Sequence, residues 1–163
     1  MTVTQCDSVT SQVTFDRGTG LSVCMESVMD KQQAEAWHKK TQEIRARYPR
    51  LFPRPVGFSC PPAWAEIIED ALRQLEKAAE RMGLPDDLYP HITDIKEKYG
   101  TLRIYHDDYS PAGDDSFDRI VEEAEARSER TCIVCGEPGN ISEGGLWCYC
   151  DAHRPAVEND FVL

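Results

Sequence analysis

The chain has 163 residues and a formal net charge of −11 at pH 7, with 29 acidic against 18 basic side chains. This length is enough for one compact domain, or for one domain with a small appended module. No run of 18 apolar residues occurs, which excludes a membrane-spanning helix, and the first fifteen residues lack the basic and apolar regions of a signal peptide. We therefore expect a cytoplasmic protein.

The acidic residues are concentrated beyond the first third of the chain. Residues 1–60 carry 8 Lys and Arg against 6 Asp and Glu, residues 61–130 carry 9 against 18, and residues 131–163 carry 1 against 5. A surface of that sign repels nucleic acid over most of its area and attracts a basic partner. The alternative is that the acidic surface only keeps the protein soluble.

The first thirty residues predict a polar N-terminal tail and a hairpin. In residues 13–25, apolar side chains alternate on both sides of a turn at residues 16–20. Residues 31–130 are expected to form the core, which opens with a helix through about residue 48. The buried side of this helix is Trp37, Thr41, Ile44 and Tyr48, which recur every three or four residues before Pro49 ends the pattern.

The two main amphipathic helices are predicted at residues 62–82 and 116–128. The first begins with prolines in its first turn, where the backbone N–H that proline lacks would have no partner within the helix. Its apolar residues form a single stripe, and Gly83 and Pro85 mark its end. Between the two helices, residues 92–105 form two extended runs about Tyr99 and Gly100, which predicts a β-hairpin. The expected fold class is α+β, with these helices, β-hairpins, and a C-terminal zinc-ribbon or zinc-knuckle module at residues 131–154, before a tail at 155–163.

The module is predicted from a cluster of metal-ligating residues. Cys132 and Cys135 form a C-x2-C pair, and after fourteen intervening residues Cys150 and His153 form a C-x2-H pair. Such pairs hold structural Zn²⁺ in tetrahedral geometry, and an odd total of seven cysteines in a reducing compartment disfavours disulfides. Cys148 could replace Cys150 through a small shift in the turn. A redox pair, a catalytic zinc and an iron–sulfur cluster fit the surrounding sequence less well.

Three stretches of the chain resemble one family of proteins. They are IKEKYGTLRIYH (95–106), IVEEAEARSERTCIVCGEPG (120–139) and GLWCYCDAHR (145–154), and they resemble small, largely uncharacterised proteins encoded in bacterial genomes, prophages and phages. The resemblance covers residues 47–154 and brings no established activity. In that family the last knuckle looks like LCDAH, which implies that Cys150, and not Cys148, is the ligand.

Two surfaces are candidate partner-binding sites. Glu122, Glu123 and Glu125 fall on the outer side of the helix at 116–128, where carboxylates could imitate a row of phosphates. Lys96, Lys98, Arg103 and Tyr105 could form a basic, aromatic strip on one face of the hairpin, suited to phosphate or to an acidic partner. The alternative is that both are solvated surfaces.

The sequence thus predicts a small acidic, zinc-binding interaction protein, encoded by a phage or mobile element, that binds and inhibits a host protein such as a defence nuclease or a nucleic-acid-handling complex. A second hypothesis is a nucleic-acid-binding regulator that uses a basic helix at residues 39–54 or the zinc module. A third is a metal-dependent hydrolase. For that hypothesis Asp94 and Glu97 resemble the metal site of a nuclease only faintly, and His91 and His106 have no visible partners.

Overall fold

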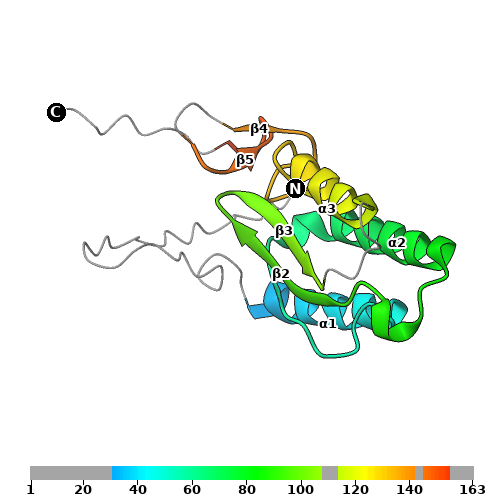
Figure 1. Ribbon diagram of the computed structural model, residues 1–163. Coiled ribbons are helices and arrows are strands. Elements are labelled where there is room, and N and C mark those ends of the chain that lie inside the picture. The colour runs from blue at the N-terminus through cyan, green and yellow to red at the C-terminus, as the bar shows by residue number, and fades with distance from the viewer. Residues whose placement is uncertain (1–30, 108–113, 142–144, 155–163) are drawn as a thin grey trace, which may run out of the picture.

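The structure is a computed structural model, and it describes residues 31–107, 114–141 and 145–154. The helices are α1 (Lys31–Arg47), α2 (Ala65–Met82) and α3 (Ser116–Ser128), with short 3-10 turns η2 (Pro62–Trp64) and η3 (Asp86–Leu88). The strands are β1 (Phe58–Ser59), β2 (Ile92–Lys98), β3 (Thr101–His106), β4 (Asn140–Ile141) and β5 (Cys148–Tyr149). The α+β class is therefore confirmed (Figure 1). The hairpin predicted at 13–25 and both tails lie outside the described residues.

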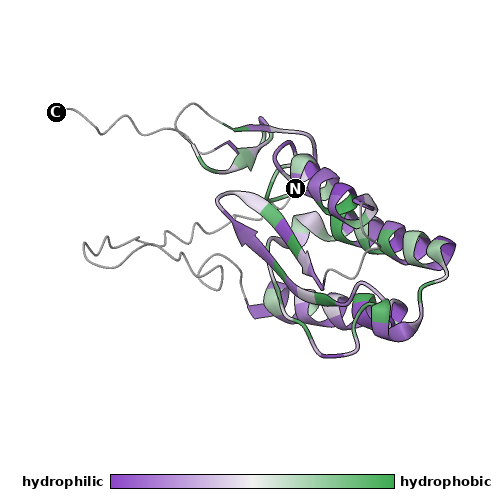
Figure 2. Ribbon diagram, in the orientation of Figure 1, coloured by the Kyte–Doolittle hydropathy of each residue, from purple (hydrophilic) through white to green (hydrophobic). Residues whose placement is uncertain are grey.

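Helix α2 is the centre of the buried core. Its apolar residues fall on one side because their spacing matches the helical repeat. Seven of them are buried: Ile67, Ile68, Ala71, Leu72, Leu75, Ala78 and Ala79. The helix ends at Gly83, whose φ of 66° lets its N–H and that of Leu84 bond back to the last turn. Figure 2 shows hydrophobic residues alternating with hydrophilic ones along α2 and α3, as expected for helices with one buried side.

The central sheet has the order β1-β2-β3, with β1 parallel and β3 antiparallel to β2. Tyr99 and Gly100 connect β2 to β3, and both have positive φ, 55° and 81°, as a type I′ turn requires. One face of the hairpin is buried in the core through Ile95, Leu102 and Ile104. The hairpin predicted around Tyr99 and Gly100 is confirmed.

Helix α3 runs beside α2 and along the outer edge of β3. The backbone N–H of Leu102 donates to the hydroxyl of Ser128, 2.9 Å away, so α3 satisfies a group at the edge of the sheet. Arg103 on β3 pairs with Glu125 on α3, and Arg127 pairs with Asp70 on α2 at 2.5 Å. These contacts fix the direction in which the chain leaves α3, and the first cysteine pair follows directly.

Residues 131–154 form a small unit of their own at the end of α3. It contains the two-stranded sheet β4-β5 and a bridge between Thr131 and Pro138. The unit touches the core at the tip of the hairpin, where a Cβ added to Gly100 would lie 1.9 Å from the carbonyl oxygen of Leu146. The module therefore meets the core through α3, through the hairpin turn, and at Gly136, where an added Cβ would lie 3.1 Å from the carbonyl oxygen of Ala63.

Two further predictions, the basic helix at residues 39–54 and the absence of a membrane-spanning helix, can be compared with this fold. The basic stretch at residues 39–54 is not one helix, because α1 ends at Arg47, just before Tyr48 and Pro49. Among the described helices, none is long and apolar enough to cross a membrane.

Candidate metal centre

The first pair of cysteines lies in a tight turn directly after α3. The N–H of Cys132 donates to the carbonyl of Glu137 at 2.8 Å, and the N–H of Gly136 donates to the carbonyl of Cys132 at 2.9 Å. Gly136 has a φ of 79°, which favours glycine at this position. The turn therefore reverses the chain so tightly that the side chains of Cys132 and Cys135 can reach one point.

The second pair follows strand β5. The N–H of His153 donates to the carbonyl of Cys150 at 3.1 Å, which closes a turn between the two side chains. The two halves are held together by the N–H of Ile133, which donates to the carbonyl of Cys148 at 3.1 Å. They also approach closely at Gly139, where an added Cβ would lie 2.6 Å from the backbone of Tyr149. Any larger residue there would push the second pair away from the first.

The four predicted ligand side chains meet at one point. Their ligand atoms, the Sγ of Cys132, Cys135 and Cys150 and a ring nitrogen of His153, all lie within 4.8 Å of one another. Cys135 and Cys150 have their sulfurs 3.7 Å apart, and the Nδ1 of His153 lies 3.7 Å from the sulfur of Cys132 and 3.3 Å from that of Cys150. The residues are therefore close enough to hold a metal ion.

Three of the six separations are close to the edges of a tetrahedron and far from the length of a disulfide. With Zn–S of about 2.3 Å and Zn–N of about 2.0 Å, a tetrahedral ion separates two sulfurs by about 3.8 Å and a sulfur from a nitrogen by about 3.5 Å. A disulfide would bring two sulfurs to about 2.05 Å. The observed 3.7, 3.7 and 3.3 Å separations leave room for an ion of that size between the four atoms.

Cys132 lies in surroundings that favour the thiolate, the form that binds metal. Burial by itself would raise the pKa of Cys132, but backbone N–H groups of Cys150, Cys135 and Val134 that point at its sulfur lower the pKa to about 6. Such N–H donors also stabilise metal-bound sulfur. The donor set fits a soft or borderline metal ion such as Zn²⁺.

Cys148 lies outside this group of four. It is fully buried, and its sulfur lies 2.9 Å from where a Cβ on Gly139 would be. Burial raises the pKa of its thiol, so Cys148 favours the protonated form. From β5 its side chain therefore packs against Gly139 as a small apolar group, while Cys150 belongs to the cluster of potential ligands.

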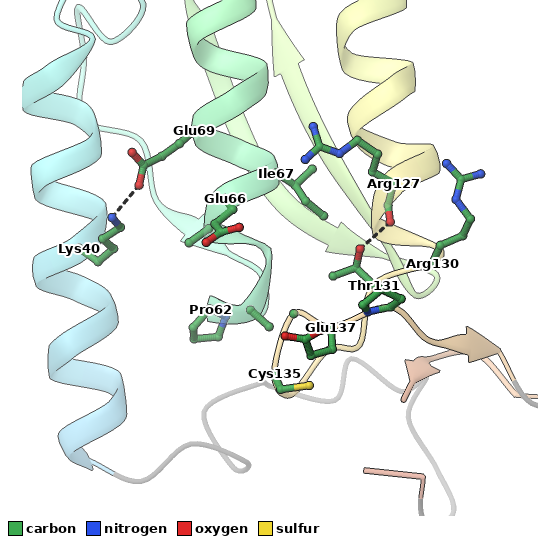
Figure 3. A pocket seen from close by; sticks show the side chains of 14 residues that line it. Lys40, Pro62, Glu66, Ile67, Glu69, Arg127, Arg130, Thr131, Cys135 and Glu137 are labelled. Carbon is green, nitrogen blue, oxygen red and sulfur yellow. Dashed lines mark hydrogen bonds and ion pairs between the residues drawn. The ribbon is translucent and has the colours of Figure 1, made fainter. Parts of the chain in front are cut away.

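The metal-binding cluster is partly open to solvent. Cys132 is buried and Cys150 half-buried, whereas Cys135 and His153 are exposed. Beside Cys135, a cavity of about 740 Å³ separates the first knuckle from α1 and α2. Figure 3 shows Glu66 and Glu69 on one side of it, Cys135 and Glu137 on the knuckle, and Arg127 and Arg130 above.

The basic residues near α1 are largely occupied by the acidic middle of the same chain. Lys40 pairs with Glu69 at 2.6 Å, Arg47 pairs with the same carboxylate, and Arg50 pairs with Asp86 at 2.8 Å. Burial alone would raise the pKa of Glu69, but the charges of Lys40 and Arg47 lower it. Three of the six basic residues at 39–54 are therefore paired with carboxylates of the same chain.

The two predicted partner surfaces are adjacent, not separate. Glu122 and Glu123 are exposed on α3, as expected, but Glu125 is half-buried because it pairs with Arg103 of the hairpin strip. Lys96 and Tyr105 lie on the open face of the sheet, where the ammonium group sits 5.0 Å from the ring centre. Lys98 likewise lies 5.4 Å from the ring of Tyr99. Glu125 and Arg103 thus join α3 to the sheet.

The residues considered for a hydrolase do not form a shared site in the described structure. Asp94 accepts a bond from Lys96, whereas Glu97 accepts one from the N–H of Gly100 in the turn. His91 lies 4.0 Å from Asp107, and His106 lies 3.7 Å from Asp118. Among the described residues, the three cysteines and His153 are the one group of three or more potential metal ligands.

The sequence did not predict the contact between Gly100 and Leu146. The positive φ of the turn already accounts for a glycine at that position, so no additional signal marked the approach of a distant loop. The pairing of Asp70 with Arg127 was also missed, because the residues are 57 positions apart. No protein-family model matches the chain, and no curated protein or solved structure was found to match it.

Proposed function

We propose that the chain is a zinc-containing interaction protein in which a structural Zn²⁺ holds the C-terminal module against the α+β core. The observation that carries this proposal is the close approach of three sulfurs and one ring nitrogen, which all lie within 4.8 Å of one another. Four protein ligands complete the coordination of zinc, so no position is left for a substrate or a reactive water. The module is then a zinc knuckle whose role is to build a surface, and catalysis by the ion is disfavoured.

Metal analysis of the purified protein tests the first part. We expect one equivalent of zinc per chain in the wild type and loss of that zinc in Cys135→Ser, whose exposed position avoids burying a hydroxyl group. Cys148→Ser is the matched control, because it removes a sulfur from the same module without touching the four ligands. Retention of zinc by Cys135→Ser together with its loss from Cys148→Ser would overturn the assignment.

The partner of this protein is proposed to be a basic surface on another protein. Exposed Glu122 and Glu123 on α3 support this proposal, because both carboxylates face solvent on the same helix. The resemblance to phage and prophage proteins suggests a host protein, such as a defence nuclease or a nucleic-acid-handling complex, that would be inhibited when its basic groove is covered. The cytoplasm of the host cell is then the place of action.

Affinity capture from host lysate, followed by mass spectrometry, would identify the partner. Glu122→Gln with Glu123→Gln should then weaken its binding if carboxylates imitate phosphates. Glu125 is unsuitable for this test, because its replacement would also release Arg103 and disturb the contact between α3 and the sheet. The control is the pair Glu76→Gln with Glu80→Gln on α2, which removes the same charge elsewhere. An unchanged affinity in the α3 variant would contradict charge imitation.

The other two functions have less support. A nucleic-acid-binding regulator that uses residues 39–54 would have to break the ion pairs of Lys40, Arg47 and Arg50 with acidic residues of the same chain. A hydrolase would require metal-dependent turnover that is lost in Glu97→Gln or His106→Gln while folding persists. Absence of such turnover agrees with the proposal of a binding protein.

A further inference from the structure

The open face of the β2–β3 hairpin is unlike the rest of the acidic protein. The pairing register places Asp94 opposite Tyr105, Lys96 opposite Arg103, and Lys98 opposite Thr101, all on the face away from the core. Along the hairpin toward its tip, Tyr105 comes first. The row of Lys96 and Arg103 follows, then the row that contains Lys98, and Tyr99 lies in the turn. The cations thus lie between the two aromatic rings, and residues 101–105 of β3 alone span about 13 Å.

The rings on this face are available to a ligand. Tyr99 is 73% exposed and Tyr105 is 39% exposed, while their neighbours on the other face of the hairpin are buried. Each ring has an ammonium group beside it, Lys98 at 5.4 Å from Tyr99 and Lys96 at 5.0 Å from Tyr105. A base can stack on such a ring while its phosphate meets the adjacent ammonium group.

We propose that this hairpin strip, composed of Lys96, Lys98, Tyr99, Arg103 and Tyr105, is a binding site for single-stranded nucleic acid. The ligand is a single strand because bases that are stacked inside a duplex cannot reach the tyrosine rings. An acidic protein would be attracted by the cations but would gain nothing comparable from two exposed rings. The site borders the acidic surface of α3 proposed above but uses different residues, so the two proposals can fail independently.

The charges on the strip set the balance between stacking and ion pairing. Asp94 pairs with Lys96 at 2.5 Å, and Glu125 pairs with Arg103, so two of the three cations are already partly neutralised. A bound phosphate must compete with these carboxylates. Stacking on the tyrosines therefore supplies most of the affinity, and Asp94→Asn should strengthen binding because it releases Lys96.

Fluorescence polarisation with a labelled dodecamer of oligouridylate, or of oligothymidylate, at low salt tests this proposal. We expect the zinc-loaded wild type to bind both single strands and to bind a duplex of the same length at least tenfold more weakly. Tyr105→Ala should lose at least about fivefold in affinity, while Tyr105→Phe, which keeps the ring, should bind like the wild type. Tyr99→Asn should lose a similar factor, and asparagine tolerates the positive φ of the turn.

A charge-matched control separates the strip from the overall charge. Lys96→Gln with Lys98→Gln should reduce the slope of log affinity against log salt by about 1.4, the effect of two phosphate contacts on a single strand. Lys77→Gln with Arg81→Gln removes two exposed cations from α2 and should leave that slope unchanged. Circular dichroism and zinc content, measured on every variant, verify that the fold persists.

Four results would overturn the proposal: no binding by the wild type, equal binding of the duplex, equal losses in the strip and α2 variants, or tyrosine variants that bind like the wild type. In the last case, competition by polyglutamate as strong as that by the oligonucleotide would identify the strip as a surface for acidic proteins. Stronger binding by Asp94→Asn, together with loss in Tyr105→Ala, supports it.

Discussion

The helical core and the C-terminal module are held together by different means. The core buries one large cluster of apolar side chains from three helices and the sheet, among them Trp64, Leu72 and Phe117. In the module, strands β4 and β5 have two residues each, and the buried side chains of residues 131–154 that the structure describes are Cys132 and Cys148. Because so little apolar area is buried there, the proposed metal ion would supply the stabilisation that burial supplies elsewhere.

Removal of the metal should give the largest difference in stability between the module and the core. Zinc binding contributes on the order of 10 kcal/mol to the folding of small zinc modules. A strong chelator should therefore unfold residues 131–154 while the core remains folded. Amide hydrogen exchange is expected to accelerate to the rate of an unfolded chain in the module and to stay slow in α2. Persistent protection of the module without metal would show that packing alone holds it.

A cavity in the core should have the opposite effect. Leu72 is fully buried on α2, and Leu72→Ala should lower the free energy of unfolding of the core by about 3 kcal/mol. The variant should still bind one equivalent of zinc, because the four ligands lie in a different region. Denaturant unfolding and metal analysis of the same sample measure the two effects. Loss of zinc in this variant would mean that the module depends on the core for its shape.

The junction between the two regions can be tested at Gly100. An alanine there would place its Cβ 1.9 Å from the carbonyl oxygen of Leu146, at a φ of 81° that disfavours any side chain. We expect Gly100→Ala to cost about 2 kcal/mol and to increase exchange in the hairpin tip and around Leu146 together. Gly57→Ala is the control, since nothing lies within 4 Å of its added Cβ. Equal effects of the two substitutions would contradict a packed junction.

The smallest effect on stability is expected when an ion pair on the surface of the α+β core is removed. Glu69→Gln removes the partner of Lys40 and Arg47, which should cost about 1 kcal/mol at pH 7. Because those cations lower the pKa of Glu69 below its ordinary value of 4.5, the stabilisation is complete above that value and is lost as the pH falls through the lowered pKa. The difference between wild type and variant should therefore shrink below pH 4.5 in urea titrations. Glu66→Gln, which removes an exposed carboxylate one turn earlier on the same helix, is the matched control.

The sequence predicted what local patterns determine. The periodic apolar residues of α2, the turn at Tyr99 and Gly100, and the spacing of Cys132, Cys135, Cys150 and His153 each lie within a short segment, and each structure formed where it was expected. The spacing alone left Cys148 as an alternative ligand. Only the structure, in which the buried side chain of Cys148 packs against Gly139, places this cysteine apart from the cluster.

What the sequence did not predict depends on contacts between distant segments. Glu125 was expected to face a partner, but the chain brings Arg103 beside it from 22 positions away. Lys40 and Arg47 lie in the stretch predicted to contact phosphates, but both pair with Glu69. Charges are easily counted in a sequence, but their pairing depends on how helices and strands pack, and that packing decides which charges remain for a partner.

The most direct test of the zinc-held module is the X-ray absorption fine structure at the zinc edge of the purified protein. The account predicts one zinc per chain with three sulfurs at about 2.3 Å and one imidazole nitrogen at about 2.0 Å, unchanged in Cys148→Ser. Absence of zinc, a fourth sulfur in place of the nitrogen, or a first shell made up of oxygens would contradict it.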